Sequence, residues 1–125
     1  MVKPRILLIE DSPEGQQFVS EALCNQGYAV STLSDAERAL ATVEEWAQQF
    51  ELVIIEEAMH GRSGLTLLRE ARTKRSNLPV VIVTRDGNWS SYARALDAGA
   101  CDYIVHPIDR RELVTAVEEA LARAS

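Results

Sequence analysis

The stretch Glu51–Gly64, ELVIIEEAMHGRSG, places four apolar residues directly before two glutamates. The run Leu52–Ile55 is continuous in Leu, Val and Ile, which is typical of a strand buried on both faces of a parallel sheet. An ionised carboxylate at the end of such a strand needs a partner, a metal or contact with solvent, because an isolated buried charge is costly. The stretch therefore predicts a central strand with a candidate site at its end.

Four further apolar runs extend this pattern along the chain. Arg5–Glu10 and Pro79–Thr84 are again nearly continuous, Ala29–Ser34 alternates as a strand nearer a sheet edge does, and Asp102–His106 is the fifth run. A helical pattern follows each run, so strands and helices alternate five times. This alternation predicts an α/β domain of doubly wound (βα)5 architecture, with a five-stranded parallel sheet and helices on both faces.

The helical segments are marked by start signals and by apolar residues at helical spacing. Ser12 and Pro13 are typical of a helix start, and Asp109 with Glu112 forms a capping box before the last helix. We expect the apolar stripes to pack on the sheet. These stripes are Phe18, Ala22 and Leu23; Ala36, Ala39, Leu40, Val43 and Ala47; Leu65, Leu68 and Ala71; Trp89, Tyr92, Ala93 and Leu96; and Leu113, Val114, Val117 and Leu121.

The composition is that of an ordinary soluble domain. The chain has 125 residues, 46% hydrophobic and 26% charged, with a net charge of −6. This length fits one domain spanning residues 1–125. The negative charge argues against direct binding to nucleic acid, and no apolar run approaches a membrane span or a signal-peptide core. Cys24 and Cys101 show no metal or redox spacing, so we expect small, buried or partly buried residues of a cytoplasmic protein and not a disulfide. The alternative is a free reactive thiol.

Polar side chains follow four of the predicted strands where each strand ends. Glu10 and Asp11 close the first strand, and Glu56, Thr84 and His106 close the third, fourth and fifth. Ligands of open α/β sheets bind beyond the carboxyl ends of the strands, so these groups are expected to converge. Three carboxylates without clustered Cys or His favour a hard cation, above all Mg²⁺. The alternative is that they are merely polar residues where strands meet solvent.

At these positions the chain resembles the receiver domain of two-component response regulators. The family's first strand ends in two acids, as does Ile6–Ser12, ILLIEDS. Its third strand ends in the phospho-accepting aspartate, followed by Met, Pro and Gly, and here Glu56, Met59 and Gly64 fall on the acceptor, the Met and the Gly. Ala98–Pro107, AGACDYIVHP, is similar to the segment that carries a switch aromatic and an essential lysine. The resemblance covers nearly the whole chain and implies a flavodoxin-like fold.

The resemblance implies a metal site and a phosphoryl donor. In the family, the acid pair and the acceptor hold Mg²⁺, which assigns the metal to Glu10, Asp11, Glu56 and a backbone carbonyl near Ala58. A histidine kinase donates the phosphoryl group to the acceptor position, here Glu56. The domain itself is expected to be a signalling module and not an enzyme.

The resemblance also implies a switch. Thr84 falls on the hydroxyl that bonds the phosphoryl group, Tyr103 on the aromatic that then turns inward, and His106 on the lysine. Pro107 becomes a candidate for a cis peptide bond. The surface made by the fourth helix, fifth strand and fifth helix is then expected to change shape and to contact an effector domain or a second copy of the chain.

Two departures from the family concern the reacting groups. Glu56 is longer than aspartate by one methylene, about 1.5 Å of bond length, and an offset of about 1 Å can cost roughly a hundredfold in phosphoryl-transfer rate. His106 replaces a permanent cation with one that is charged only when protonated. It is either protonated beside Glu56 or neutral and bonded to the backbone.

Further departures lie in the loops. His60 replaces the family's proline, Arg62 and Ser63 replace apolar and acidic residues, and Arg85 stands where a small residue is usual. Arg85 either folds over the site and neutralises its acids or lies in solvent. Glu57 should point away from its neighbour in the strand, because side chains alternate. We expect Glu57 to be a surface acid that could pair with His60 or Arg62.

These observations favour a receiver-like module that is phosphorylation-deficient or phosphorylation-independent and acts through protein contacts, with a histidine kinase or another signalling protein as partner. One alternative is a working receiver that is phosphorylated slowly. Another is a small Mg²⁺-dependent phosphohydrolase, although no separate substrate loop or cap is evident. Family members often continue into an effector domain, so residues 1–125 could belong to a longer protein.

Overall fold

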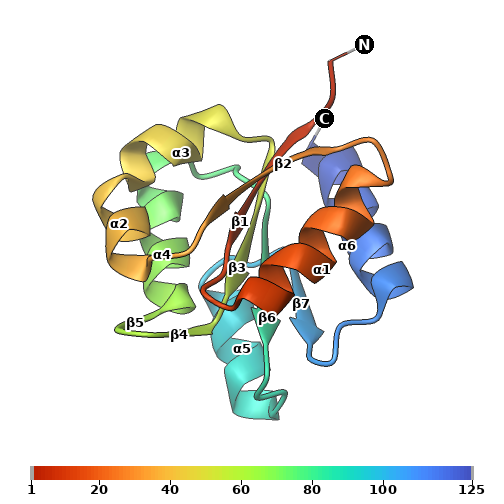
Figure 1. Cartoon of the computed structure of the whole chain (residues 1–125). Helices are drawn as coiled ribbons and strands as arrows, with labels where there is room; N and C mark the ends of the chain where they lie inside the picture. Colours follow the sequence, from red (N-terminus) through yellow and green to blue (C-terminus); the bar gives the residue numbers. More distant parts are fainter. Residues whose placement is uncertain (1, 125) are drawn as a thin grey trace.

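Five parallel strands form the central sheet of the computed structural model, which describes residues 2–124 (Figure 1). All neighbouring strands in this sheet pair in parallel. The chain order reverses between β1 and β3, and crevices at such reversals are where α/β folds bind ligands. The strands are β1 (Arg5–Ile9), β2 (Ala29–Leu33), β3 (Leu52–Glu56), β6 (Val80–Thr84) and β7 (Asp102–Val105), in the order β2-β1-β3-β6-β7.

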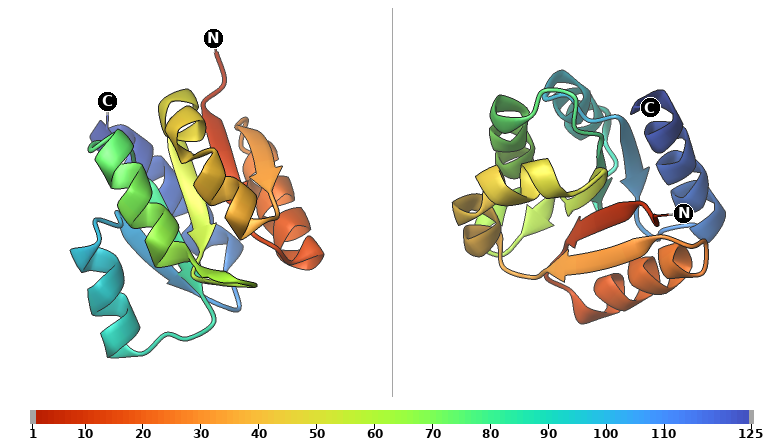
Figure 2. Two further views of the ribbon diagram at one scale, coloured as in Figure 1. Left: turned by 90° about the vertical axis from the view of Figure 1, so that its left-hand side faces the viewer. Right: turned by 90° about the horizontal axis from the view of Figure 1, so that it is seen from above.

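Within residues 2–124, six helices cover the two faces of the sheet (Figure 2). α1 and α6 pack on one face, against Ile6 and Leu8 of β1, whereas α2 to α5 pack on the other face, against Leu7 and Ile9. None of these helices has the length and apolar character needed to cross a bilayer. The helices are α1 (Pro13–Cys24), α2 (Ala36–Ala41), α3 (Val43–Gln49), α4 (Gly64–Lys74), α5 (Trp89–Asp97) and α6 (Arg110–Ala124).

The two burial patterns among the strands follow the sequence. Every residue of β3 and β6 is buried, as their continuous apolar runs predict. β2, whose sequence alternates, is an edge strand and is only partly buried. The expected five-stranded α/β fold is therefore confirmed, with α5, β7 and α6 as the predicted fourth helix, fifth strand and fifth helix.

The segment after Asp35 forms two short helices where the apolar stripe suggested one. The break lies at Thr42, whose φ of −113° and ψ of 15° leave the helical region. The Thr42 hydroxyl donates to the carbonyl of Arg38 at 2.8 Å, and buried Trp46 donates its indole N–H to the carbonyl of Ala39 at 2.8 Å. These side chains satisfy carbonyl groups at the break and hold α3 against α2.

A two-stranded hairpin between β3 and α4 was not predicted. β4 (Ala58–Met59) and β5 (Arg62–Ser63) pair in antiparallel fashion, and Gly61 turns between them with a φ of +82°. The hairpin lies at the carboxyl end of the sheet, beside the ends of β1 and β3 (Figure 1). It therefore carries the loop residues that depart from the family into the neighbourhood of the candidate site.

Several residues expected in the core are exposed. Trp89 is 78% exposed, and Phe18, Tyr92 and Leu96 are also on the surface. α5 instead packs through the small residues Ser91 and Ala95, because its most apolar side faces outward. The prediction was wrong here because periodicity shows which side of a helix is apolar, not which side is covered.

The cysteines also differ from expectation. Both Cys24 and Cys101 are free and exposed, where we expected buried or partly buried side chains. Cys24 ends α1, and Cys101 lies in the short connection between α5 and β7. Both stand at element ends, where a small side chain reaches solvent easily.

Candidate functional site

Alternation along the strands sends the polar residues at the sheet's carboxyl end to two different faces. Glu10, Glu56 and His106 continue the rows that face α1 and α6, and one ligand atom from each lies within 4.8 Å of the others. Glu10 is 3% exposed and Glu56 is 2% exposed. We call these three residues the buried cluster.

The carboxylate of Glu56 is held by His106. The Nε2 atom of His106 lies 2.7 Å from Oε1 of Glu56, a hydrogen-bonded contact. The second oxygen, Oε2, is buried and has no hydrogen-bond partner within residues 2–124. The His106 side chain therefore contacts Glu56 directly, and the peptide bond that follows it to Pro107 is cis.

Glu10 lies under the first turn of α1. Its Oε2 accepts a hydrogen bond from the backbone N–H of Ser12 at 3.1 Å. Its Oε1 occupies space beside Gly15, where an added Cβ would come within 2.5 Å of this oxygen. Burial, with further contributions from the charge of Glu56, raises the pKa of Glu10 to about 7, so this carboxyl is partly protonated at neutral pH.

Burial also shifts the pKa values of the other two members of the cluster toward their neutral forms. Burial raises the pKa of Glu56, and interactions with the Glu10 carboxyl, with the backbone N–H of Ala58 and with the charge of Arg85 oppose this only in part. Burial lowers the pKa of His106, and Arg85 lowers it further. Charged groups lose solvation in such a site. A neutral imidazole bonded to Glu56 therefore fits the structure better than an imidazolium.

Asp11 points away from the buried cluster, toward the hairpin. Its Oδ2 accepts the backbone N–H of His60 at 2.9 Å and lies 2.8 Å from His60 Nδ1. Burial alone would raise the pKa of Asp11, but the hydrogen bonds from His60 outweigh it and the pKa is lowered. The structure thus brings Glu10 and Glu56 together and leaves Asp11 with a different partner.

The rim of the site is formed by exposed and half-buried residues of the hairpin. Ala58, Met59 and His60 line a hollow together with Asp11 and Arg85. The backbone at Ala58 therefore lies near Asp11 and on the open side of the site. Gly64, where α4 begins, passes so close to β3 that a Cβ there would overlap the carbonyl oxygen of Glu56.

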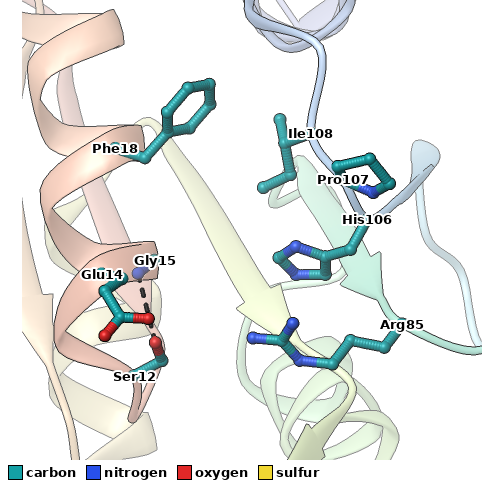
Figure 3. Close-up of a pocket in the computed structure, with 8 residues that line it drawn as sticks. All are labelled: Ser12, Glu14, Gly15, Phe18, Arg85, His106, Pro107 and Ile108. Carbon is teal, nitrogen blue, oxygen red and sulfur yellow. Dashed lines mark hydrogen bonds between the residues drawn. The ribbon is translucent and has the colours of Figure 1, made fainter.

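Arg85 lies at the mouth of a cleft that leads to His106. Figure 3 shows its side chain reaching below the imidazole toward Ser12 and Gly15 on the opposite wall. The cleft has a volume of ≈ 590 Å³. Arg85 is an exposed residue, which agrees with the expectation that it lies in solvent, yet its charge lowers the pKa of both Glu56 and His106.

The second group of polar residues faces α5. Thr84 is buried, and its Oγ1 accepts the backbone N–H of Asp86 at 3.0 Å. The hydroxyl of Tyr103 donates to the carbonyl of Asp86 at 2.9 Å, and its ring meets that of Tyr92 edge-on at 5.4 Å. Burial and then the charge of Glu57 raise the pKa of Tyr103. We call Glu57, Thr84 and Tyr103 the switch side.

Glu57 points away from Glu56 as expected, but it is not a free surface acid. It is half-buried, its Oε1 is buried without a hydrogen-bond partner within residues 2–124, and it lines a hollow with Thr84. Neither expected pairing occurs, because His60 contacts Asp11 and Arg62 pairs with Glu37 at 2.7 Å.

Sequence reasoning missed two features of the site. It did not identify Gly15, although glycine in the first turn of an otherwise ordinary helix signals a close approach by another group. It also did not identify the bond between Asp11 and His60, for which only the replacement of the family's proline by His60 gave any hint. Both depend on side-chain positions that spacing does not fix.

The comparisons with known proteins assign the family. Residues 6–118 match the response regulator receiver domain. The chain is 36% identical over 121 residues to the two-component response regulator PhoP of Pseudomonas aeruginosa, covering 97% of this chain and 53% of that protein. It is 33% identical over 123 residues to the transcriptional regulatory protein AruR of the same species, covering 96% and 50%. The chain belongs to the response regulator receiver domain family.

Solved structures agree with this assignment. A CheY-like receiver domain from Methanospirillum hungatei superposes with a TM-score of 0.89 at 26% identity, covering 98% of this chain and 97% of that one. A receiver domain from Clostridium thermocellum superposes with a TM-score of 0.88 at 28% identity, covering 96% and 95%. The chain spans about half the length of the curated relatives named above.

Proposed function

We propose that this receiver domain is deficient in, or independent of, phosphorylation and acts through contacts with other proteins. The observation that carries this proposal is the direct contact between Oε1 of buried Glu56 and Nε2 of half-buried His106. Phosphoryl transfer needs a free, ionised acceptor placed in line with the donor. In this domain the acceptor is longer than aspartate, its pKa is raised, and one oxygen is already bonded.

The charges around Glu56 also favour loss of phosphoryl chemistry. An acyl phosphate brings additional negative charge, which the family's lysine neutralises at the position of His106. A neutral imidazole supplies no such charge, and the lowered pKa of His106 disfavours the imidazolium. Arg85 is a possible substitute, but it lies at the mouth of the cleft and is exposed, so solvent weakens the effect of its charge.

The donor set fits Mg²⁺ poorly. Mg²⁺ prefers octahedral coordination by oxygen, and the groups that lie together are two carboxylates and an imidazole. Asp11 would have to leave His60 to complete an acid triad with Glu10 and Glu56. We therefore assign no step of the function to Mg²⁺, and we propose that any Mg²⁺ site built from Asp11 and the backbone near Ala58 is weak.

The contact surface that we propose is the one formed by α5, β7 and α6. Trp89, Tyr92, Leu96 and Val105 are large apolar residues exposed there, and exposed apolar patches mark interaction sites. Thr84 and Tyr103 link this surface to the site through Asp86. The partner is a histidine kinase, another signalling protein, an effector domain or a second copy of the chain.

A second candidate is a receiver that still accepts phosphate slowly. The switch side favours it, because Thr84 and Tyr103 match the family's residue types and are bonded to the same loop. A carboxylate also remains at position 56. The two candidates differ in one measurable property, the formation of an acyl phosphate.

The test is incubation with acetyl phosphate and Mg²⁺, followed by intact-mass analysis. We expect no adduct on the wild-type domain and a hydroxylamine-labile phosphoryl adduct on the double variant Glu56→Asp/His106→Lys, which restores both family residues. Glu56→Asp alone should gain less, because His106 remains. Glu57→Asp is the matched control and should stay unmodified. A stoichiometric adduct on Glu56 of the wild-type domain would favour the second candidate and sink the first.

A further inference from the structure

The buried cluster presents three metal-ligating side chains from three different strand ends. Glu10 follows β1, Glu56 ends β3 and His106 follows β7. Their ligand atoms lie within 4.8 Å of one another, and a tetrahedral ion with ligand bonds of about 2.1 Å needs ligand atoms roughly 3.4 Å apart. Small side-chain rotations are therefore enough to bring all three atoms onto one ion, and the strands hold the backbone in place.

An unpartnered oxygen points to a cation in this cluster. Glu56 is 2% exposed, and its Oε2 has no hydrogen-bond partner within residues 2–124. A buried carboxylate oxygen in that state is costly unless it gains a donor or a cation. A metal ion between Glu10, Glu56 and His106 would satisfy this oxygen and replace the contact between Glu56 and His106.

The identity of the ligands selects the class of ion. Imidazole is a good ligand for Zn²⁺ and related transition ions, whereas Mg²⁺ requires oxygen ligands in near-ideal octahedral geometry. Two carboxylates with one imidazole leave a fourth position open, as in catalytic zinc sites with three protein ligands. The cleft lined by Arg85 and Ser12 reaches His106 from solvent and gives an entry path (Figure 3).

We infer that Glu10, Glu56 and His106 form a binding site for a divalent transition metal of the Zn²⁺ class, selective against Mg²⁺. The site differs from the family's magnesium site in its ligands, because His106 takes part and Asp11 does not. Metal binding and phosphoryl transfer are separate properties, so either can fail while the other holds.

Calorimetric titration with Zn²⁺ and with Mg²⁺ tests this site. The exposed cysteines are removed first, as Cys24→Ser/Cys101→Ser, because free thiols bind Zn²⁺ on their own. We expect one Zn²⁺ per chain, bound at least about a hundredfold more tightly than Mg²⁺. The chain has two histidines, which supply a matched pair of variants. His106→Ala should weaken Zn²⁺ binding by at least about tenfold, and His60→Ala should change it by less than about threefold.

Nuclear magnetic resonance of the histidine rings tests the same site without relying on a variant that folds. On adding one equivalent of Zn²⁺, the Nε2 resonance of His106 should shift strongly, while the ring of His60 stays unchanged. Three results would overturn the inference: Mg²⁺ binding as tight as Zn²⁺, Zn²⁺ affinity unaffected by His106→Ala in a folded variant, or Zn²⁺ shifting His60 in place of His106.

Discussion

The buried cluster and the switch side occupy the same end of the sheet but are built in different ways. Glu10, Glu56 and His106 lie inside, under α1 and α6, with Glu56 and His106 in direct contact. The side chains of Thr84 and Tyr103 face α5, and both bond to the backbone of Asp86, in the loop before that helix. The first group consists of titratable side chains that lie against one another, and the second is bonded to a surface loop.

Under the function proposed above, this difference separates the acceptor position from the contact surface. Glu56 and His106, the departures that concern the reacting groups, lie in the buried cluster. Thr84 and Tyr103, which keep the family's types, lie on the side that meets the exposed surface of α5. This arrangement is compatible with a domain that has changed its acceptor chemistry while keeping the connection from the sheet to a contact surface.

The largest expected effect is the pH dependence of stability, which comes from the buried cluster and not from the switch side. The pKa of Glu10 is about 7 in the folded domain against 4.5 for an ordinary glutamate, so the folded state binds more protons between these values. The free energy of unfolding should therefore fall as pH rises from about 4.5, by up to about 3 kcal/mol, and level off above pH 7 to 8. Urea denaturation in a metal-free buffer measures this.

The window above pH 6.5 isolates the carboxyl groups. His106 has a lowered pKa, so its effect has the opposite sign and is confined to pH values below about 6.5. Glu10→Gln should flatten the fall between pH 6.5 and 8, whereas Glu14→Gln, on an exposed part of α1, should keep it. A wild-type stability that is constant across this window would contradict the buried, partly protonated state of Glu10.

A somewhat smaller loss of stability is expected from a substitution at Gly64, which lies against the backbone of both Glu56 and Glu57. Gly64 donates its N–H to the carbonyl of Glu57 at 2.7 Å, and a Cβ there would overlap the carbonyl of Glu56. Gly64→Ala should lower the free energy of unfolding by about 2–3 kcal/mol through overpacking against backbone. Gly27→Ala is the control, since Gly27 has a φ of +91° but open space around it, and it should cost only about 1 kcal/mol. Equal losses in the two variants would exclude the steric cause.

The smallest expected effect is the loss of stability when one hydrogen bond of the switch side is removed. Tyr103→Phe removes the hydrogen bond to the carbonyl of Asp86 while keeping the ring contact with Tyr92. We expect a loss of about 1 kcal/mol, the usual net value of one hydrogen bond. Tyr92→Phe keeps both rings and should cost less than about 0.5 kcal/mol. A larger loss of stability for Tyr92→Phe than for Tyr103→Phe would contradict the assignment of the stabilising hydrogen bond to Tyr103.

The sequence predicts the fold well because the strands have distinct apolar patterns. Continuous apolar runs identify β3 and β6, and alternation identifies β2 as an edge strand. The meeting of Glu10 and Glu56 is also predictable, since both follow strands beside the point where the chain order reverses. The place of Asp11 is not predictable, because its partner His60 is positioned by a hairpin only two residues long on each side.

The outward side of α5 could not be predicted for a different reason. Trp89, Tyr92 and Leu96 form an apolar stripe, and a stripe is the usual signal for burial. The helix packs on the sheet through Ser91 and Ala95 instead. Periodicity cannot separate an apolar stripe that packs inward from one that is kept for another molecule.

The close approach between Glu10 and Gly15 ties two positions of the sequence together. Glu10 Oε1 fills the space that a side chain at position 15 would need. The long side chain of glutamate at position 10 therefore fits only because position 15 is glycine. An aspartate at position 10 would withdraw its carboxylate from that space. In relatives of this domain, glutamate at position 10 should therefore occur with glycine at position 15, and aspartate should permit alanine or larger residues.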